Sequence, residues 1–152
     1  MSRGKSEIRI SNIEYRISNI ETNWSKIQNQ EAMSHNENSK RYDLEERTFE
    51  FAKASRAFVK QLPRTISNIE DVKQFIRASG SIGANYIEAN EAIGKKDFVM
   101  EVNICRREAK ESRYWLRLID TDGRLEGDQA LLLDEADELM KIFGAIVRKS
   151  EQ

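Results

Sequence analysis

Apolar residues recur every three or four positions in four stretches of the chain after residue 41, which is the period of α-helices that each bury one face. The first stretch covers residues 42–62. Asp43, with Glu46 three residues later, predicts the N-terminal cap of this helix. Pro63 predicts its end, because the residue before a proline is disfavoured in the α region. The predicted inner face consists of Leu44, Thr48, Phe51, Ser55, Phe58 and Leu62.

The second stretch begins with cap residues at 65–68, and its helix is expected to fray near residues 92–94. A glycine within an exposed helix lowers its stability by roughly 1 kcal/mol. Gly80, Gly83 and Ala84 therefore predict that a neighbouring backbone approaches closely here. The predicted inner face consists of Ile69, Val72, Ile76, Ser79, Gly83 and Tyr86.

The third and fourth stretches predict two further helices, over residues 98–119 and 128–149, joined by a turn-rich connection at 120–127. Asp97 lies near the start of the third helix, where a carboxylate favours the positive end of the helix dipole. Cys105 falls on the apolar stripe of that helix and is interpreted as a small buried hydrophobe. The predicted inner faces consist of Phe98, Val102, Cys105, Ala109, Ser112, Leu116 and Ile119, and of Leu132, Ala136, Leu139, Phe143, Ile146 and Val147.

Four helices joined by short connections predict an all-α protein, an antiparallel up-down-up-down four-helix bundle over residues 41–150. The composition supports this fold class. The chain of 152 residues has one Pro and seven Gly, few for a fold built from turns and short strands. It is 39% hydrophobic and 34% charged, so a core can be buried beneath a charged surface.

Residues 1–40 are predicted to form an N-terminal extension. The sequence Ile-Ser-Asn-Ile-Glu occurs at residues 10–14 and again at 17–21, which places isoleucines on one side of a helix. Ser, Asn and Ile are mediocre helix formers, so the extension is either a marginal amphipathic helix or disordered. Met33 is an alternative start codon, in which case the repeat is translated upstream DNA.

The composition also predicts where the protein works. A single Cys excludes a disulfide-stapled fold and fits a reducing compartment. No apolar run approaches the ~18–20 residues that cross a bilayer, and the N-terminus lacks the apolar stretch of a secretory signal. We therefore expect a cytoplasmic protein without a membrane partner. The formal net charge of −1 produces no global basic field that would favour nucleic acid.

The residues that enzymes most often use are scarce. The only histidine is His35, in the extension. A di-metal carboxylate bundle, a zinc site and a Ser/His/Asp triad all require histidines, so these enzyme classes are excluded. We expect no catalytic residues, no metal and no cofactor.

A basic stripe on the third predicted helix is the surface feature with the clearest functional meaning. Its members are spaced four, three and four, and Arg107 lies beside them. The stripe could bind phosphates, remain a solvated face, or pair with the acids of a partner subunit. The fourth helix offers such acids at Asp134, Glu135, Asp137 and Glu138. The members of the stripe are Arg106, Lys110, Arg113 and Arg117.

Two smaller groups of residues complete the candidates. Three polar residues on or beside the inner side of the second helix are interpreted as structural hydrogen-bonding groups: Asn85, Glu88 and Asn90. Large apolar residues beside the core stripes predict an exposed patch and hence an oligomer: Phe49, Val59, Ile104 and Trp115.

Three segments resemble the four-helix bundle protein family, also called the 23S ribosomal RNA intervening-sequence protein family. Residues 81–89 read Ser-Ile-Gly-Ala-Asn-Tyr-Ile-Glu-Ala, residues 95–98 read Lys-Lys-Asp-Phe, and residues 108–116 read Glu-Ala-Lys-Glu-Ser-Arg-Tyr-Trp-Leu. Many members have proline where this chain has Gly83 and glycine where it has Ala89, so the second helix is expected to run straighter here. The resemblance covers residues 42–149.

This resemblance implies a bacterial, cytoplasmic, non-enzymatic bundle that forms homopentameric rings. Some members are encoded inside rRNA genes, and one relative is an accessory protein to a reverse transcriptase. The family has no established catalytic residues. We therefore predict a self-assembling helical scaffold or accessory protein. The alternative is an RNA-binding accessory protein, associated with rRNA or a nucleic-acid enzyme, that uses the basic stripe.

Overall fold

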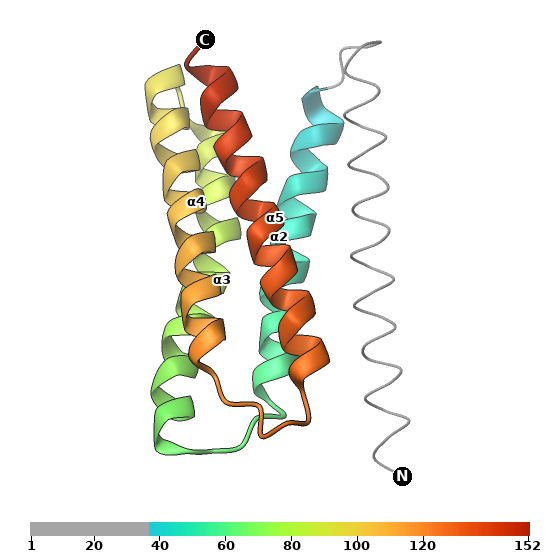
Figure 1. Cartoon of the computed structure of the whole chain (residues 1–152). Helices are drawn as coiled ribbons and strands as arrows, with labels where there is room; N and C mark the ends of the chain where they lie inside the picture. The colour runs from blue at the N-terminus through green and yellow to red at the C-terminus, as the bar shows by residue number, and fades with distance from the viewer. Residues whose placement is uncertain (1–36) are drawn as a thin grey trace.

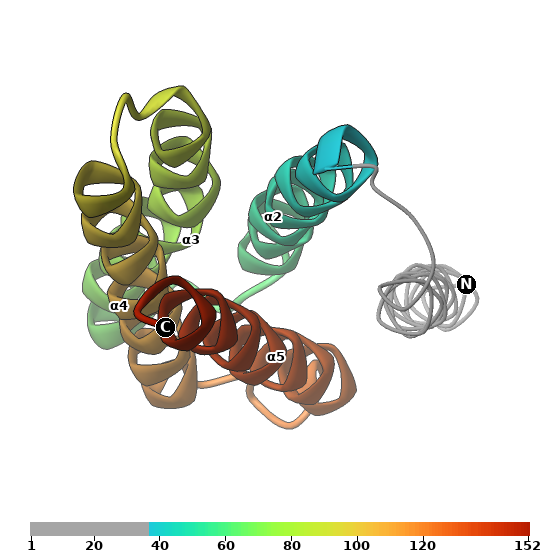
Figure 2. The ribbon, with the colours of Figure 1, turned by 90° about the horizontal axis from the view of Figure 1, so that it is seen from above.

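The structure is a computed structural model that describes residues 37–152. This part of the chain forms four helices that run alternately up and down, as Figure 1 shows. Their bounds are α2 (Glu37–Val59), α3 (Ile66–Glu91), α4 (Lys95–Leu118) and α5 (Glu126–Ser150). α3 packs most extensively on α4, and among neighbouring helices the contact between α2 and α5 is the smallest. Figure 2 shows the four helices along the bundle axis. The predicted all-α antiparallel bundle is confirmed.

The predictions about residues 1–36 lie outside the described residues. These include the amphipathic or disordered extension and the start at Met33. Helix α2 already begins at Glu37, within the segment that was assigned to the extension.

The predicted cap at the start of α2 is wrong. Asp43 and Glu46 lie inside the helix, whereas an N-cap residue has a non-helical backbone. No Pro or Gly occurs between residues 37 and 43, so nothing in the sequence stops the helix from extending backward. At its other end, α2 stops at Val59, before Pro63 but three residues short of the predicted end at residue 62. Leu62, predicted on the inner face of the helix, lies in the connection and still packs against the core.

Helix α3 has the predicted cap but a different buried face. The Thr65 hydroxyl accepts a hydrogen bond from the backbone N–H of Asn68 at 3.2 Å. Ile69, which was placed inward, is 38% exposed, and Val72 and Ile76 are only half-buried. Because α3 contacts α2 on one side and α4 on the other, its apolar arc is wider than the core face. The buried residues of α3 are Asn68, Phe75, Ala78, Ser79, Ile82, Tyr86 and Ala89.

Helices α4 and α5 follow the predicted patterns closely. All inward residues predicted for them are buried except Phe98 and Ile146, which are half-buried and pack against the core. The connection between the helices turns through Asp122 and Gly123, both with positive φ. Gln129 then donates hydrogen bonds to two carbonyls at the end of α4, at 2.8 and 2.9 Å.

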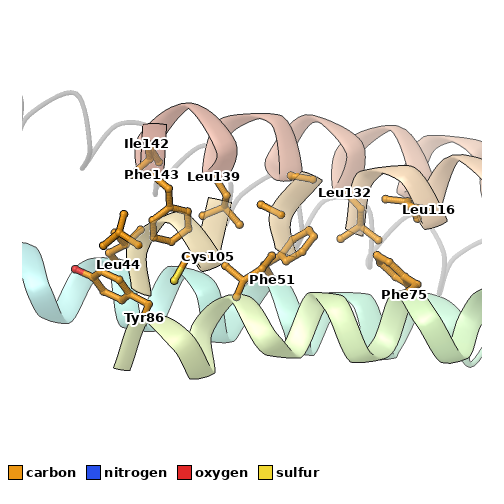
Figure 3. Packing of buried hydrophobic residues seen from close by; sticks show 14 of the residues in the cluster. Leu44, Phe51, Phe75, Tyr86, Cys105, Leu116, Leu132, Leu139, Ile142 and Phe143 are labelled. Atoms are coloured by element: carbon orange, nitrogen blue, oxygen red, sulfur yellow. The ribbon is translucent and has the colours of Figure 1, made fainter. Parts of the chain in front are cut away.

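The core runs the length of the bundle and consists mainly of phenylalanine, leucine and isoleucine (Figure 3). Tyr86 packs against Phe143 with ring centroids 5.7 Å apart. Cys105 is completely buried, as predicted, and burial, with a smaller contribution from Glu101, raises the pKa of its thiol to about 12. The thiol therefore stays protonated and acts as a small apolar group.

The expected close approach occurs at one of the three small residues. A Cβ atom on Gly83 would lie 2.9 Å from the Thr48 hydroxyl oxygen, so only glycine lets α2 and α3 pack this tightly. Gly80 lies beneath the Arg56 side chain, whose flexible end could move aside. Ala84 is exposed, so the prediction is wrong there.

A buried ion pair joins α2 to α5. The Arg47 guanidinium donates to both carboxylate oxygens of Glu135, over 2.7 Å from Nε and 3.0 Å from Nη2. The two side chains are 2% and 5% exposed. Glu135 was predicted to lie on an exposed acidic face, which is wrong. It shares the inward face of α5 with Leu132 and Leu139, because positions three and four apart lie on one side of a helix.

A second buried polar group, Asn68, ties together the two connections at the same end of the bundle. Its amide nitrogen donates to the carbonyl of Pro63 at 3.0 Å and to that of Asp120 at 2.8 Å. Its amide oxygen accepts from the backbone N–H of Asp120 at 2.9 Å. One side chain thus links the α2–α3 connection to the α4–α5 connection.

Candidate interaction surfaces

The basic stripe lies on α4 as predicted, but its members have different surroundings. Arg106, Lys110 and Arg117 are exposed, and so is Arg107 beside them. Arg113 is half-buried, and its Nε lies 2.7 Å from Oδ1 of Asp137 on α5. The Arg113 N–H does not point at this oxygen, so the contact is an ion pair without a directed hydrogen bond.

Two contacts define how α4 is aligned with α5. Arg113 faces Asp137, and Arg106 lies beside Gly144. Arg106 and Arg113 are as many residues apart on α4 as Asp137 and Gly144 are on α5. Both contacts therefore fit one antiparallel alignment of the two helices.

This register divides the stripe in two. Arg113 and Arg117 lie in the half that faces the acids of α5. The other half lies level with the basic C-terminal part of α5. We call the four basic residues at this level of the two helices the upper basic cluster. Only one of the four, Lys141, has an ion pair within the described chain, at 3.3 Å from Glu138. The upper basic cluster consists of Arg106, Lys110, Lys141 and Arg148.

The acids of α5 do not form the free acidic face that was predicted. Asp137 pairs with Arg113, Glu138 pairs with Lys141, and Glu135 is buried. Asp134 is exposed. The charges of α5 therefore serve mainly contacts within the subunit.

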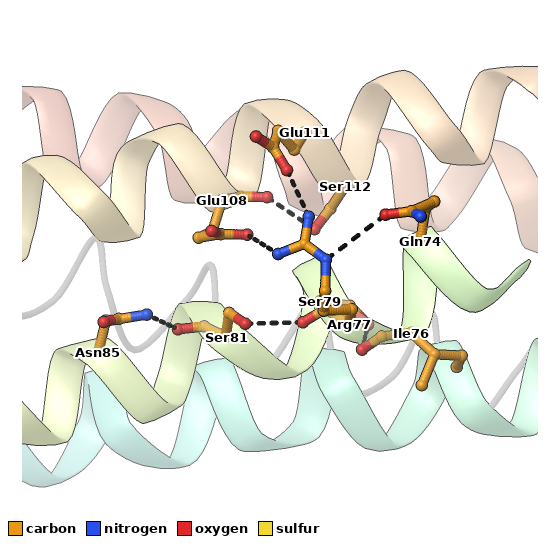
Figure 4. Close-up of polar contacts among 9 residues, drawn as sticks. All are labelled: Gln74, Ile76, Arg77, Ser79, Ser81, Asn85, Glu108, Glu111 and Ser112. Atoms are coloured by element: carbon orange, nitrogen blue, oxygen red, sulfur yellow. Dashed lines mark hydrogen bonds and ion pairs between the residues drawn. The ribbon is translucent and has the colours of Figure 1, made fainter. Parts of the chain in front are cut away.

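A charged network crosses the seam between α3 and α4 (Figure 4). The Arg77 guanidinium lies 2.8 Å from Oε2 of Glu111 and 3.8 Å from Oε2 of Glu108. Burial raises the pKa of the Glu108 carboxyl, and the charge of Glu111 raises it further, whereas Arg77 and Arg107 act in the opposite direction. These ion pairs connect α3 to α4 at the edge of the apolar core.

The three predicted structural polar residues have different outcomes. Asn85 donates to the carbonyl of Ser81 at 2.7 Å, within α3 (Figure 4). Asn90 donates to Oε1 of Glu45 at 2.7 Å and so links α3 to α2. Both therefore form hydrogen bonds within the subunit. Glu88 is exposed, and its assignment to the structural group is wrong.

Eight large apolar side chains are exposed in the part of the chain that the structure describes. Of the four residues predicted to form an exposed patch, only Phe49 belongs to this group, at 58% exposure. Ile104, Val59 and Trp115 are half-buried, and the last two pack against the core. The eight are Phe49, Ile66, Ile69, Ile87, Ile93, Met100, Tyr114 and Leu118.

Seven of these eight side chains lie on α3, on α4 or on the connection between them. Four of the seven lie at the end of this helical hairpin where α3 begins and α4 ends, because Asn68 at the start of α3 contacts Asp120 just after α4. We call these four the lower apolar set: Ile66, Ile69, Tyr114 and Leu118.

The residues from 37 onward contain no group of three or more His, Cys, Asp or Glu side chains that could hold a metal ion. None of α2 to α5 is long and apolar enough to cross a membrane.

Comparisons with known proteins give one consistent result. A sequence model described as the 23S rRNA-intervening sequence protein matches residues 40–145. A crystal structure of a protein of unknown function from the S23 ribosomal protein family of Bacteroides thetaiotaomicron is similar, with a TM-score of 0.59 and 28% sequence identity. The similarity covers 68% of this chain and 96% of that one. No curated protein matches this chain.

Proposed function

The chain belongs to the 23S rRNA-intervening sequence protein family, and we propose that it is a non-enzymatic helical bundle that assembles into a ring-like homo-oligomer. In this role it acts as a scaffold or an accessory protein. The absence of histidine from residues 36–152 supports a non-enzymatic role, because general acid–base chemistry near neutral pH depends most often on that residue.

The observation that carries this proposal is the concentration of exposed apolar side chains on α3 and α4. Ile66 is 87% exposed, Tyr114 56% and Leu118 49%. Scattered exposed apolar residues are normal, but a group on one hairpin is typical of a surface that another chain covers. Large aromatic and aliphatic side chains are also the residues that stabilise interfaces most.

We expect the Ile69→Glu and Leu118→Glu double variant to dissociate the oligomer. Two carboxylates in an apolar interface would weaken association at least roughly tenfold, because each would lose water without gaining a partner. Light scattering coupled to size exclusion, at micromolar concentration, measures the mass. Phe49→Ser is the matched control, since it removes an exposed apolar residue from α2 and should leave the oligomer intact. A monomeric wild-type protein, or a double variant with unchanged mass, would contradict the proposal.

Nucleic-acid binding is the second candidate function. The observation that favours it is that Arg106, Lys110 and Arg117 are exposed and have no carboxylate partner among residues 37–152. Side chains of this kind neutralise phosphates and release counterions when they bind.

If this second function holds, the affinity for a structured RNA will fall steeply with salt. Each phosphate contact contributes a slope of about −0.9 in a plot of log affinity against log salt for a duplex. Lys110→Gln with Arg117→Gln should then weaken binding and flatten the slope by about two units. Filter binding between 50 and 300 mM salt would measure this. An RNA affinity that does not change with salt would exclude the function.

A further inference from the structure

Two arginine side chains from different helices converge over Gly144. A Cβ atom placed on this glycine would lie 3.3 Å from Nη1 of Arg148 and 3.8 Å from Nε of Arg106. One terminal nitrogen of Arg148 and the Nε and Cδ atoms of Arg106 therefore lie within about 4 Å of one point on the surface of α5. Gly144 itself is buried, although it lies between two exposed arginines, because their side chains cover it.

This convergence is not explained by the contacts of the folded chain. Glu138 and Asp137 of α5 already have partners, which are Lys141 and Arg113. Glu151, the carboxylate closest to Arg148 along the chain, is exposed and forms no ion pair with it. No ion pair to Arg106 or Arg148 occurs in the part of the chain that the structure describes. The C-terminal end of a helix dipole favours a cation such as Arg148, but it does not account for an arginine that reaches the same point from the middle of α4.

We propose that Arg106 and Arg148 form a binding site for a phosphate group, with Gly144 as its floor. Two neighbouring guanidinium groups suit a tetrahedral oxyanion, because each offers several N–H donors in a rigid plane. The anion would also relieve the repulsion between the two cations. Lys110 and Lys141, the other members of the upper basic cluster, add positive charge around the site.

Gly144 has a clear part in this arrangement. A glycine in the middle of a helix is less favourable than alanine by roughly 1 kcal/mol, so its presence here requires a reason. The missing side chain leaves room for both arginines to lie against the helix. The proposal deepens the second candidate function, since a phosphodiester of nucleic acid is one source of the phosphate group. A free phosphorylated small molecule is the other.

The test uses the full chain and two probes, inorganic phosphate and a short structured RNA. Phosphate binding is followed by NMR through the Nε–H signals of the arginines, and RNA binding by fluorescence anisotropy. We expect Arg106→Gln and Arg148→Gln each to weaken phosphate binding roughly tenfold, the loss of one charge-assisted contact. Arg117→Gln, on the same helix but two turns or more away, is the matched control and should bind phosphate like the wild type.

The possible results distinguish the proposed phosphate site from nucleic-acid binding, the second candidate function. If the RNA affinity also falls in Arg106→Gln and Arg148→Gln, the phosphate belongs to a nucleic acid. If phosphate binds at this site but RNA does not, the site takes a small phosphorylated molecule and the second candidate function fails. If RNA binds equally well to the wild type and to both variants, the function stands and the proposed site is overturned. The site is also overturned if phosphate affects all variants equally or none.

Gly144→Ala provides a variant that keeps the fold. Alanine favours the helix, so the free energy of unfolding should stay the same or rise. The added methyl group would displace the end of the Arg148 side chain by a few tenths of an ångström. We expect weaker phosphate binding in a protein that is no less stable. Unchanged phosphate binding in Gly144→Ala would contradict the role given to the glycine.

Discussion

Glu135→Gln is expected to lower the free energy of unfolding by about 3–5 kcal/mol, the typical effect of removing one partner of a buried ion pair. The Arg47 guanidinium would remain charged in an interior where it is 2% exposed, and a neutral amide cannot compensate it. Urea unfolding followed by circular dichroism would measure the change. A loss of this size is a large part of the ~5–15 kcal/mol that stabilises an ordinary domain.

The half-exposed pair between Arg113 and Asp137 supplies the matched control. Its side chains are 38% and 40% exposed, so water screens the interaction and Asp137→Asn should cost no more than about 1 kcal/mol. A double variant, Arg47→Met with Glu135→Leu, should recover most of the stability that Glu135→Gln loses, because two apolar side chains leave no buried charge. If Glu135→Gln and Asp137→Asn lower the free energy of unfolding equally, the buried pair stabilises the fold no more than an exposed one.

Asn68→Ala is expected to cost about 3 kcal/mol, because it leaves several backbone groups without a partner. The amide makes three hydrogen bonds, to Pro63 and twice to Asp120, and its residue is 2% exposed. An unsatisfied buried polar group typically costs about 1–3 kcal/mol. The variant should also loosen the two connections that Asn68 links, and faster amide hydrogen exchange at Asp120 would report this.

Asn85→Ala is the control for this experiment. The Asn85 amide makes a single hydrogen bond, to a carbonyl of its own helix, and alanine favours that helix. Its expected cost is therefore below about 1 kcal/mol. If the two asparagine variants were equally stable, the link between the connections would contribute nothing to the fold.

Much of the bundle could be read from the spacing of apolar residues. The stripe on α4, from Val102 to Leu116, is buried throughout, because no residue in it conflicts with the helical period. On α3 the predicted inner face included Ile69, which is exposed. A helix with neighbours on two sides has a broad apolar arc, and residue spacing alone does not show which part of that arc faces the core. The start of α2 was misplaced because a good cap residue, Asp43, also occurs in helix interiors.

The candidate site was predictable only in part. The basic residues of α4 were visible as a stripe, but their partners come from α5 and are far away in the sequence. The sequence does not show that Asp137 neutralises Arg113 or that Arg148 joins Arg106. Nothing in the sequence indicates that Arg47 is buried or that Asn68, predicted only as a cap residue, links the two connections, because a charged or polar residue within an amphipathic pattern is usually exposed.

The sequence by itself determined the helices, their order and most of the core, because helix formation and the burial of an apolar stripe depend on residues three and four positions apart. The tertiary structure decided which charges are buried, which are paired and which are free. Those outcomes depend on the register between α4 and α5 and on the approach of α2 to both neighbours. Register is set by the packing of whole helices, and no local pattern of residues records it.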